Sequence, residues 1–171
     1  MNLNEVRAFA REKHGAQKDK QGRDYYDGHL RPIAEALRPF GEDAEAAGWL
    51  HDVLEDTPAE AVDLVAAGVP AHVVAAVESV TKREDEKDYL DLIARSAADP
   101  LGRLVKLADN SWNILSNPAL AATEPERAAA MLNQKYLPAR ELLLAACDWS
   151  LDSAEVAGMY EVLRGHLDQR T

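Results

Sequence analysis

Signals for helix starts recur along this chain, and they constrain its fold more than any other feature. Residues 57–60 and 123–126 each place a glutamate three positions after a threonine, which is the pattern of a capping box, and each contains a proline suited to a first helical turn. Asp99 and Pro100 repeat the combination of capping residue and first-turn proline. Apolar residues with helical periodicity follow each signal. Helices are therefore expected over most of the chain.

Composition supports an all-α fold with one domain. Aromatic residues make up 6% of the chain, and β-branched residues gather only in short valine runs. The length of 171 residues suits one compact domain, and no repeat or linker divides it. We expect a single helical bundle over 1–171, with a core at 4–147 and Asn4 as the first helix cap. The expected helices are 4–17, 29–39, 42–56, 58–68, 70–80, 85–97, 101–115, 127–147 and 152–167, with loops at 18–28 and 117–122.

Charge and cysteine content limit the possible partners and location. The formal net charge of -11 argues against a general nucleic-acid binder, although a few local cations can still hold a small anion. No apolar stretch approaches the roughly 20 residues that span a membrane, and the first residues lack the pattern of a signal peptide. Cys147 is the single cysteine, which fits a reducing compartment. We expect a cytoplasmic protein, in which the helix at 152–167 either covers the core or forms a homodimer contact.

The adjacent pair His51 and Asp52 is the most informative chemical feature. An imidazole beside a carboxylate can give two ligands to one divalent metal, and Glu55 and Asp56 follow one helical turn later. Apolar residues flank these groups on both sides, so the segment is expected to lie partly inside the protein. Buried polar groups are unfavourable unless they are paired or coordinated. The segment therefore predicts a metal site with two carboxylates beside it.

Two further residues can complete a metal shell. His29 follows the loop at 18–28, and Asp109 stands among leucine, valine and alanine residues on a predicted helix. Together with His51 and Asp52 they offer two nitrogens and two oxygens, leaving coordination positions for water and substrate. This donor set suits Mn, Fe, Co or Zn, and the single cysteine excludes a thiolate-rich zinc site. Such a cation can acidify water and stabilise charge on a phosphoryl oxygen.

The ordered pattern of His29, then His51 and Asp52, then Asp109 resembles the HD-domain metal-dependent phosphohydrolases. The finer similarity is to the alarmone hydrolases, which act on guanosine tetraphosphate (ppGpp), including the hydrolase domain of the stringent-response enzymes. The resemblance covers roughly 6–136 and implies the helical bundle of an HD domain. The blocks that carry it are 26–29, 47–57, 80–82 and 105–109, followed by Asn113.

The resemblance implies a role for each matched residue and a small phosphorylated nucleotide as the partner. One divalent metal ion, usually manganese, would be bound by the two histidines and two aspartates. Glu55 and Asp56 would orient or deprotonate the attacking water and assist the leaving group. Lys18 and Lys20 would contact phosphates, whereas Asn113 and Tyr136 would contact the nucleotide.

The residues themselves leave alternatives open. The loop before the first metal histidine is shorter than in the family, and a leucine follows that histidine where proline is usual. A phosphatase of another nucleotide or phosphorylated metabolite fits these differences, and so does a silent module that binds a metal or nucleotide without turnover. Lys18 and Lys20 also suit a solvated loop, Asn113 a helix surface, and Tyr136 the core. Retention of both Glu55 and Asp56 favours an enzyme.

Overall fold

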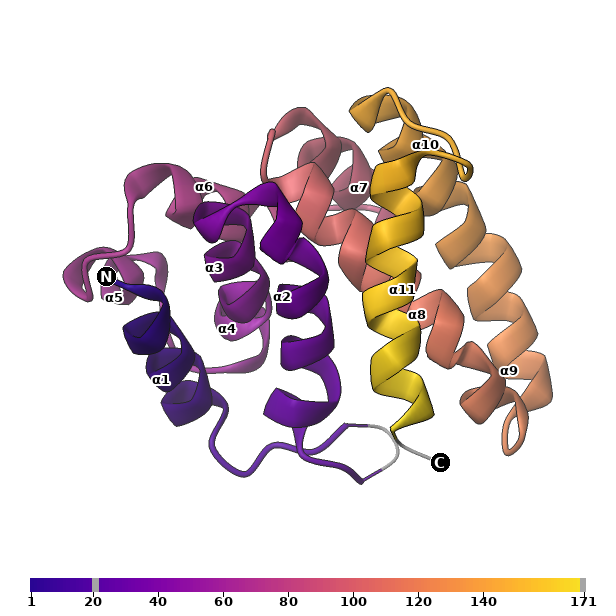
Figure 1. The fold of residues 1–171 in the computed structure, drawn as a ribbon, viewed down its shortest axis with the longest axis horizontal. Helices are drawn as coiled ribbons and strands as arrows, with labels where there is room; N and C mark the ends of the chain where they lie inside the picture. Colours follow the sequence, from indigo (N-terminus) through magenta and orange to yellow (C-terminus); the bar gives the residue numbers. More distant parts are fainter. Residues whose placement is uncertain (20–21, 170–171) are drawn as a thin grey trace.

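The computed structural model describes residues 1–19 and 22–169, and in these ranges helices and helical turns form the regular structure (Figure 1). The one β-type pairing within them is an isolated antiparallel bridge between Lys18 and Asp24. The predicted all-α fold is confirmed. The elements are α1 (Leu3–His14), η1 (Tyr26–Leu30), α2 (Arg31–Leu37), η2 (Arg38–Phe40), α3 (Glu42–Leu50), α4 (Val53–Asp56), α5 (Ala61–Ala66), α6 (Ala71–Val80), α7 (Tyr89–Ala98), α8 (Gly102–Ala121), α9 (Pro125–Ala130), η3 (Met131–Tyr136), α10 (Leu137–Cys147) and α11 (Ala154–Asp168).

The long helix α8 lies at the centre of the bundle. It contacts α2, α3 and α6 from the first half of the chain, and α7, α9 and α10 from the second half. The C-terminal helix α11 packs on both α2 and α8 (Figure 1). Its residues Val156, Met159 and Leu163 are buried there. Burial of these apolar faces is the main favourable contribution to a fold of this kind.

A glycine allows two of the core helices to approach closely. A Cβ atom at Gly48 of α3 would lie 2.8 Å from Leu37 Cδ1 and 2.9 Å from Ala34 Cα, both in α2. Real side chains do not pack at such distances, so only glycine permits this contact between α2 and α3. The approach matters for the site, because the turns at the ends of these two helices carry three of the four predicted metal ligands.

Helix starts differ from the sequence prediction where a neighbouring residue makes the better cap. Asn2 caps α1 instead of Asn4, because its side chain accepts the N–H groups of Asn4 and Glu5 at 3.0 and 3.1 Å while Glu5 accepts the Asn2 N–H at 2.8 Å. The helix predicted from residue 85 begins at Tyr89, because Asp88 caps it in the same reciprocal manner.

Segments 57–60 and 117–122 also depart from the prediction. The Thr57 hydroxyl donates to the Val53 carbonyl at 2.7 Å and closes α4, so Glu60 caps α5 in its place. The predicted loop at 117–122 is wrong, because α8 continues to Ala121 with Pro118 inside it. Asn117 is buried, and its amide donates to the Ala128 carbonyl of α9 at 3.4 Å. Packing against α9 thus holds the helix past a residue that lacks an N–H.

Neither segment that carries a predicted metal histidine is a continuous α-helix. His29 lies in the π-helical turn η1, directly before α2. The predicted helix at 42–56 is interrupted, because α3 ends at Leu50 and α4 begins at Val53. His51 and Asp52 form the turn between them. Single π-helical turns such as η1 occur frequently at functional sites.

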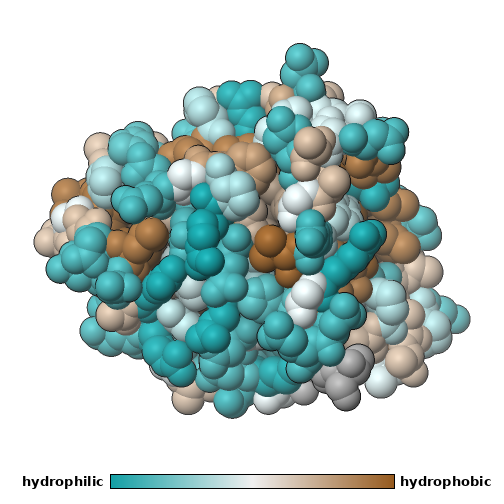
Figure 2. Space-filling view, in the orientation of Figure 1, coloured by the Kyte–Doolittle hydropathy of each residue, from teal (hydrophilic) through white to brown (hydrophobic). Residues whose placement is uncertain are grey.

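Hydrophilic residues cover much of the face seen in Figure 2, with small apolar areas between them. This surface agrees with the acidic composition. Within residues 1–19 and 22–169, none of the helices combines the length and the apolar character that crossing a membrane requires.

Candidate functional site

Three of the four predicted metal ligands lie close together. Ligand atoms of His29, His51 and Asp52 are all within 4.8 Å of one another. Asp52 Oδ2 is 2.9 Å from His51 Nε2 and 3.2 Å from His29 Nε2, and the two imidazole nitrogens are 3.4 Å apart. One carboxylate oxygen and two ring nitrogens therefore face a common point, and the three side chains form a possible metal site.

The orientation of His51 suits metal binding. Its Nδ1 lies 2.8 Å from the Gly48 carbonyl, and this nitrogen must donate because the carbonyl can only accept. Its Nε2 then faces His29 and Asp52. A backbone carbonyl that fixes the imidazole in this manner is the usual support for a histidine ligand. The donor set and this support fit a divalent transition metal.

Asp109 lies beside the cluster but is held by other partners. Its Oδ1 is 3.6 Å from His29 Nε2 and accepts a hydrogen bond from Asn113 Nδ2 at 2.7 Å. Its Oδ2 accepts Lys106 Nζ at 3.0 Å. Both Lys106 and Asp109 are buried. Asp109 is therefore near enough to complete the predicted shell, while Lys106 balances its charge inside the protein.

The buried charges shift one another's pKa values. Burial alone would lower the pKa of His51, but the neighbouring Asp52 carboxylate and its hydrogen bond raise it to about 9. Burial would raise the pKa of Asp52 and Asp109, yet His51 holds the first well below its ordinary value and Lys106 lowers the second. The carboxylates of the cluster are thus anionic and are stabilised by neighbouring positive charges. A divalent cation bound between them would stabilise them in the same way.

A cleft of about 500 Å³ opens over this cluster. Glu55 and Asp56 line it and are exposed, and each accepts a hydrogen bond from a distant segment. Glu55 Oε2 accepts the Lys82 N–H at 3.0 Å, and Asp56 Oδ2 accepts Gln17 Nε2 at 2.8 Å. The predicted residues that line the cleft are Lys18, His29, Asp52, Glu55, Asp56, Asp109, Asn113 and Tyr136, whereas His51 lies beneath the surface.

The predicted substrate contacts differ in how much of each side chain remains available. Lys18 is exposed, with Nζ 3.9 Å from Asp24 Oδ2, and Lys20 lies outside the described residues. The Asn113 amide nitrogen is occupied, since it donates to both the side chain and the backbone carbonyl of Asp109. Tyr136 is only 5% exposed and borders the cleft from the π-helical turn η3. Asn113 therefore orients a predicted metal ligand in addition to lining the cleft.

Some residues of the site were not predicted from the sequence. The Tyr25 hydroxyl donates to Asp52 Oδ2 at 2.6 Å, and burial followed by the Asp52 charge raises its pKa, so it stays a donor. Its ring stacks on buried His14, whose Nδ1 is 2.8 Å from Gln17 Oε1. Sequence spacing gave no signal for the bond between Tyr25 and Asp52, which spans 27 residues. Lys106 had a signal, because it stands three positions before Asp109 on the same helix face.

Further basic and aromatic side chains give the cleft its character. Lys82, Lys106 and Lys135 line it, as do Tyr89 and Trp112. Lys135 Nζ lies 4.2 Å from the centre of the Tyr89 ring. Cations can bind phosphate oxygens, and aromatic faces can stack on a base. The cleft therefore combines a possible metal site with the chemistry that a phosphorylated nucleotide requires.

Comparison with known proteins agrees with this chemistry. No family model matches the chain. Over 115 residues, 62% of the chain, it is 37% identical to a guanosine-3′,5′-bis(diphosphate) 3′-pyrophosphohydrolase from Aquifex aeolicus. Over 157 residues, 84% of the chain, it is 29% identical to a protein from Synechocystis sp. named a probable enzyme of the same activity. The chain spans 16% and 20% of the lengths of these two relatives.

The fold is also similar to a solved structure, described as a metazoan ortholog of SpoT that hydrolyzes ppGpp and plays a role in starvation responses. The TM-score is 0.68 at 23% sequence identity, and the match covers 98% of this chain and 94% of that one. This similarity concerns the fold. Together with the two sequence relatives, it confirms the predicted resemblance to ppGpp hydrolases.

Proposed function

We propose that this chain is a metal-dependent pyrophosphohydrolase that removes diphosphate from the 3′ position of ppGpp. The observation that carries the proposal is the meeting of His29, His51 and Asp52 under a cleft whose edge presents Glu55 and Asp56. The names of the two sequence relatives supply the substrate. In the proposed reaction one water is consumed, the bond between the 3′ oxygen and its phosphorus breaks, and GDP and diphosphate are released.

In this proposal His29, His51 and Asp52 hold one divalent cation, and Asp109 completes the shell. Of the metals that this donor set suits, which are Mn, Fe, Co and Zn, we propose manganese. When bound, such a cation would make a water more acidic and offset negative charge on a phosphoryl oxygen. Asn113 keeps Asp109 in position through its amide, and Lys106 keeps that carboxylate ionised.

We assign Glu55 and Asp56 as the general base and the general acid. Both carboxylates are exposed to the cleft, and the bonds from Lys82 and Gln17 fix their directions. Glu55 would accept the proton of the attacking water, while Asp56 would orient that water and help the 3′ oxygen to leave as a hydroxyl. Positioned acid and base groups contribute about 10²–10⁴-fold to a rate.

The other groups in the cleft are assigned to substrate binding. The substrate has a diphosphate at each end of its ribose, and cations around the cleft can meet both. We assign Lys18 and Lys20 to phosphate oxygens, and Asn113 and Tyr136 to the nucleoside. A homodimer and a cytoplasmic location stay predictions.

One specific observation supports a second enzymatic hypothesis. The loop before His29 pairs its own charges, with Arg23 Nε 2.8 Å from Asp19 Oδ2 and Lys18 Nζ 3.9 Å from Asp24 Oδ2. Cations balanced in this manner hold a highly charged substrate less strongly. A phosphatase of a less charged nucleotide or metabolite is therefore the alternative.

The test is a substrate panel with the protein loaded with Mn²⁺, followed by two variants. We expect the protein to release diphosphate from ppGpp and to form little product from GTP, GDP or sugar phosphates. Glu55→Ala should keep the bound metal and lower kcat by about 10²–10⁴-fold, as expected for a lost acid or base. Asp109→Ala should lose the metal. Turnover of another phosphate ester alone would favour the alternative, and no turnover with any substrate would favour a binding module.

A further inference from the structure

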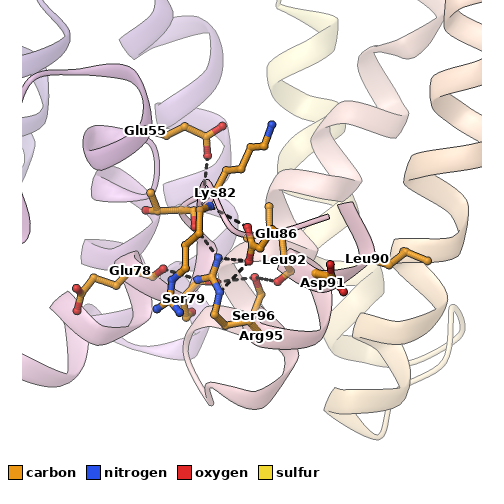
Figure 3. Close-up of polar contacts among 12 residues, drawn as sticks. Glu55, Glu78, Ser79, Lys82, Glu86, Leu90, Asp91, Leu92, Arg95 and Ser96 are labelled. Carbon is orange, nitrogen blue, oxygen red and sulfur yellow. Dashed lines mark hydrogen bonds and ion pairs between the residues drawn. The ribbon is translucent and has the colours of Figure 1, made fainter. Parts of the chain in front are cut away.

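One half-buried guanidinium joins two helices to the segment that orients Glu55. Arg95 of α7 is 19% exposed in its side chain and donates to two backbone carbonyls, Glu78 at 2.6 Å and Thr81 at 2.7 Å (Figure 3). Its Nη2 and Nε also reach Glu86 Oε1 at 2.5 and 3.0 Å. One side chain thus connects α7 to the end of α6 and to the segment at 81–88.

These bonds fix the course of the chain after α6. The last carbonyls of a helix lack partners within the helix, and a cation beside them is favourable. Arg95 supplies such a cation at Glu78 and Thr81, directly where the chain turns away from α6. Glu86 holds the same segment from the other side, because its Oε2 accepts the Arg83 N–H at 2.8 Å. The backbone between Thr81 and Glu86 is therefore anchored at both ends.

The anchored backbone contains the donor that orients Glu55. The Lys82 N–H donates to Glu55 Oε2 at 3.0 Å, across 27 residues of sequence (Figure 3). Glu55 is exposed, and within residues 1–19 and 22–169 this amide is its one hydrogen-bond donor. A glutamate side chain on a surface otherwise samples several rotamers, and only some of them point into the cleft. The Lys82 amide selects among those rotamers only while its own backbone stays in place.

We propose that Arg95 is a positioning residue that holds Glu55 in its working direction through the Lys82 amide. The inference rests on the proposed function, in which Glu55 acts on the attacking water. Arg95 does not line the cleft, so its effect must pass through the segment at 81–88. Small misplacements of a reacting group can lower a rate by about 10²-fold. Loss of the anchor should therefore reduce kcat and leave KM and metal content nearly unchanged.

The experiment compares Arg95→Lys with a matched control on the same helix. A lysine keeps the charge but has one nitrogen in place of the planar guanidinium, so it cannot hold two carbonyls and Glu86 together. We expect kcat to fall about 10- to 100-fold, with KM and bound metal within twofold of the wild type. Ser96→Ala is the control, because Ser96 Oγ donates to the Ser79 carbonyl at 2.9 Å and joins α7 to α6 without touching the segment at 81–88. Its kcat should equal that of the wild type, whatever its melting temperature.

A double-mutant cycle separates positioning from general stability. In a Glu55→Ala background the positioned group is absent, so Arg95→Lys should lower the residual kcat no further. An equal loss in both backgrounds would overturn the proposal. If Arg95→Lys does not fold, Glu86→Gln removes the charge that pairs with Arg95 and should show the same non-additive loss at smaller size.

Amide hydrogen exchange tests the anchor independently of turnover. In the substrate-free protein, Arg95→Lys should speed exchange at Lys82 and its neighbours at 81–88 and leave α8 unchanged. Unchanged exchange at Lys82 would overturn the proposal even if kcat fell. A wild type that turns over no phosphate ester would refute the proposed function and the catalytic part of this inference, while the exchange result would still decide whether Arg95 holds the segment.

Discussion

Replacing Lys106 with methionine should strongly destabilise the protein in the absence of metal. Lys106 Nζ is 3.0 Å from Asp109 Oδ2, and the two side chains are 8% and 9% exposed. At an effective dielectric constant of about 20, Coulomb's law gives roughly 5 kcal/mol for unit charges at this separation. Removing one partner of a buried pair leaves the other charge uncompensated, at a loss of about 3–5 kcal/mol. Methionine keeps most of the volume, so the loss would come from charge.

The assay is urea unfolding at pH 7 with a chelator present, followed by tryptophan fluorescence. We expect the free energy of unfolding to fall by about 3 kcal/mol, the lower end of that range, because His29 and Asn113 still face Asp109. Lys87→Met is the matched control, since Lys87 is exposed. Its effect should stay within about 0.5 kcal/mol. A loss below about 1 kcal/mol for Lys106→Met would refute the argument that the pair is isolated from water.

The pH dependence gives a second check on the same variant. Burial raises and Lys106 lowers the pKa of Asp109, with a net value below the ordinary 3.8. A carboxylate with a lowered pKa in the folded state stabilises the protein above its unfolded pKa, and this contribution disappears as the pH falls through the lowered value. The difference between wild type and Lys106→Met should therefore be full at pH 7 and shrink below about pH 4. A difference that grows towards acid pH would contradict the assignment.

Three further predictions concern the surroundings of the site. Tyr25→Phe removes the bond to Asp52 and should weaken Mn²⁺ binding about 10-fold in a metal titration; unchanged affinity would exclude this role. Gly48→Ala places a Cβ 2.8 Å from Leu37 Cδ1 and should lower the stability by about 1–3 kcal/mol in thermal unfolding, so an unchanged Tm would contradict the packing. Burial raises the pKa of Glu45, but two arginines and an indole N–H hold it below 4.5, so Glu45→Gln should flatten the acid limb of the stability curve.

The sequence predicted the helices better than their interruptions. Apolar periodicity is local, and it identifies where most helices lie. The capping boxes predicted at 57–60 and 123–126 do not form, because Thr57 and Thr123 donate instead to the carbonyls of Val53 and Leu120. The break at His51 and Asp52 has no helix breaker in the sequence. It coincides with contacts from distant residues, because Tyr25 and His29 both reach Asp52. Pro118 shows the opposite error, because a local helix breaker is tolerated where α9 packs against the same segment.

The same distinction between local and tertiary contacts applies to the candidate site. The candidate metal ligands were predicted from their residue types and order, and three of them lie close together in the structure. Among the residues that orient them, Tyr25 could not be predicted, because it reaches Asp52 across 27 residues of sequence. Asn113 and Lys106 lie one turn from Asp109 on the same helix, so their spacing gave a signal for both contacts. The phosphate contact of Lys18 stays a prediction. In the structure Lys18 and Arg23 of this loop pair with Asp24 and Asp19.

We propose that this chain uses one metal ion bound under the cleft to hydrolyse ppGpp at the 3′ position. The most direct measurement is the release of diphosphate and GDP from ppGpp by the purified chain, before chelation, after chelation, and after Mn²⁺ is restored. We expect equal amounts of the two products, loss of turnover with the chelator, and recovery with Mn²⁺. Release that persists without metal, or no release from ppGpp by the metal-loaded protein, would contradict it.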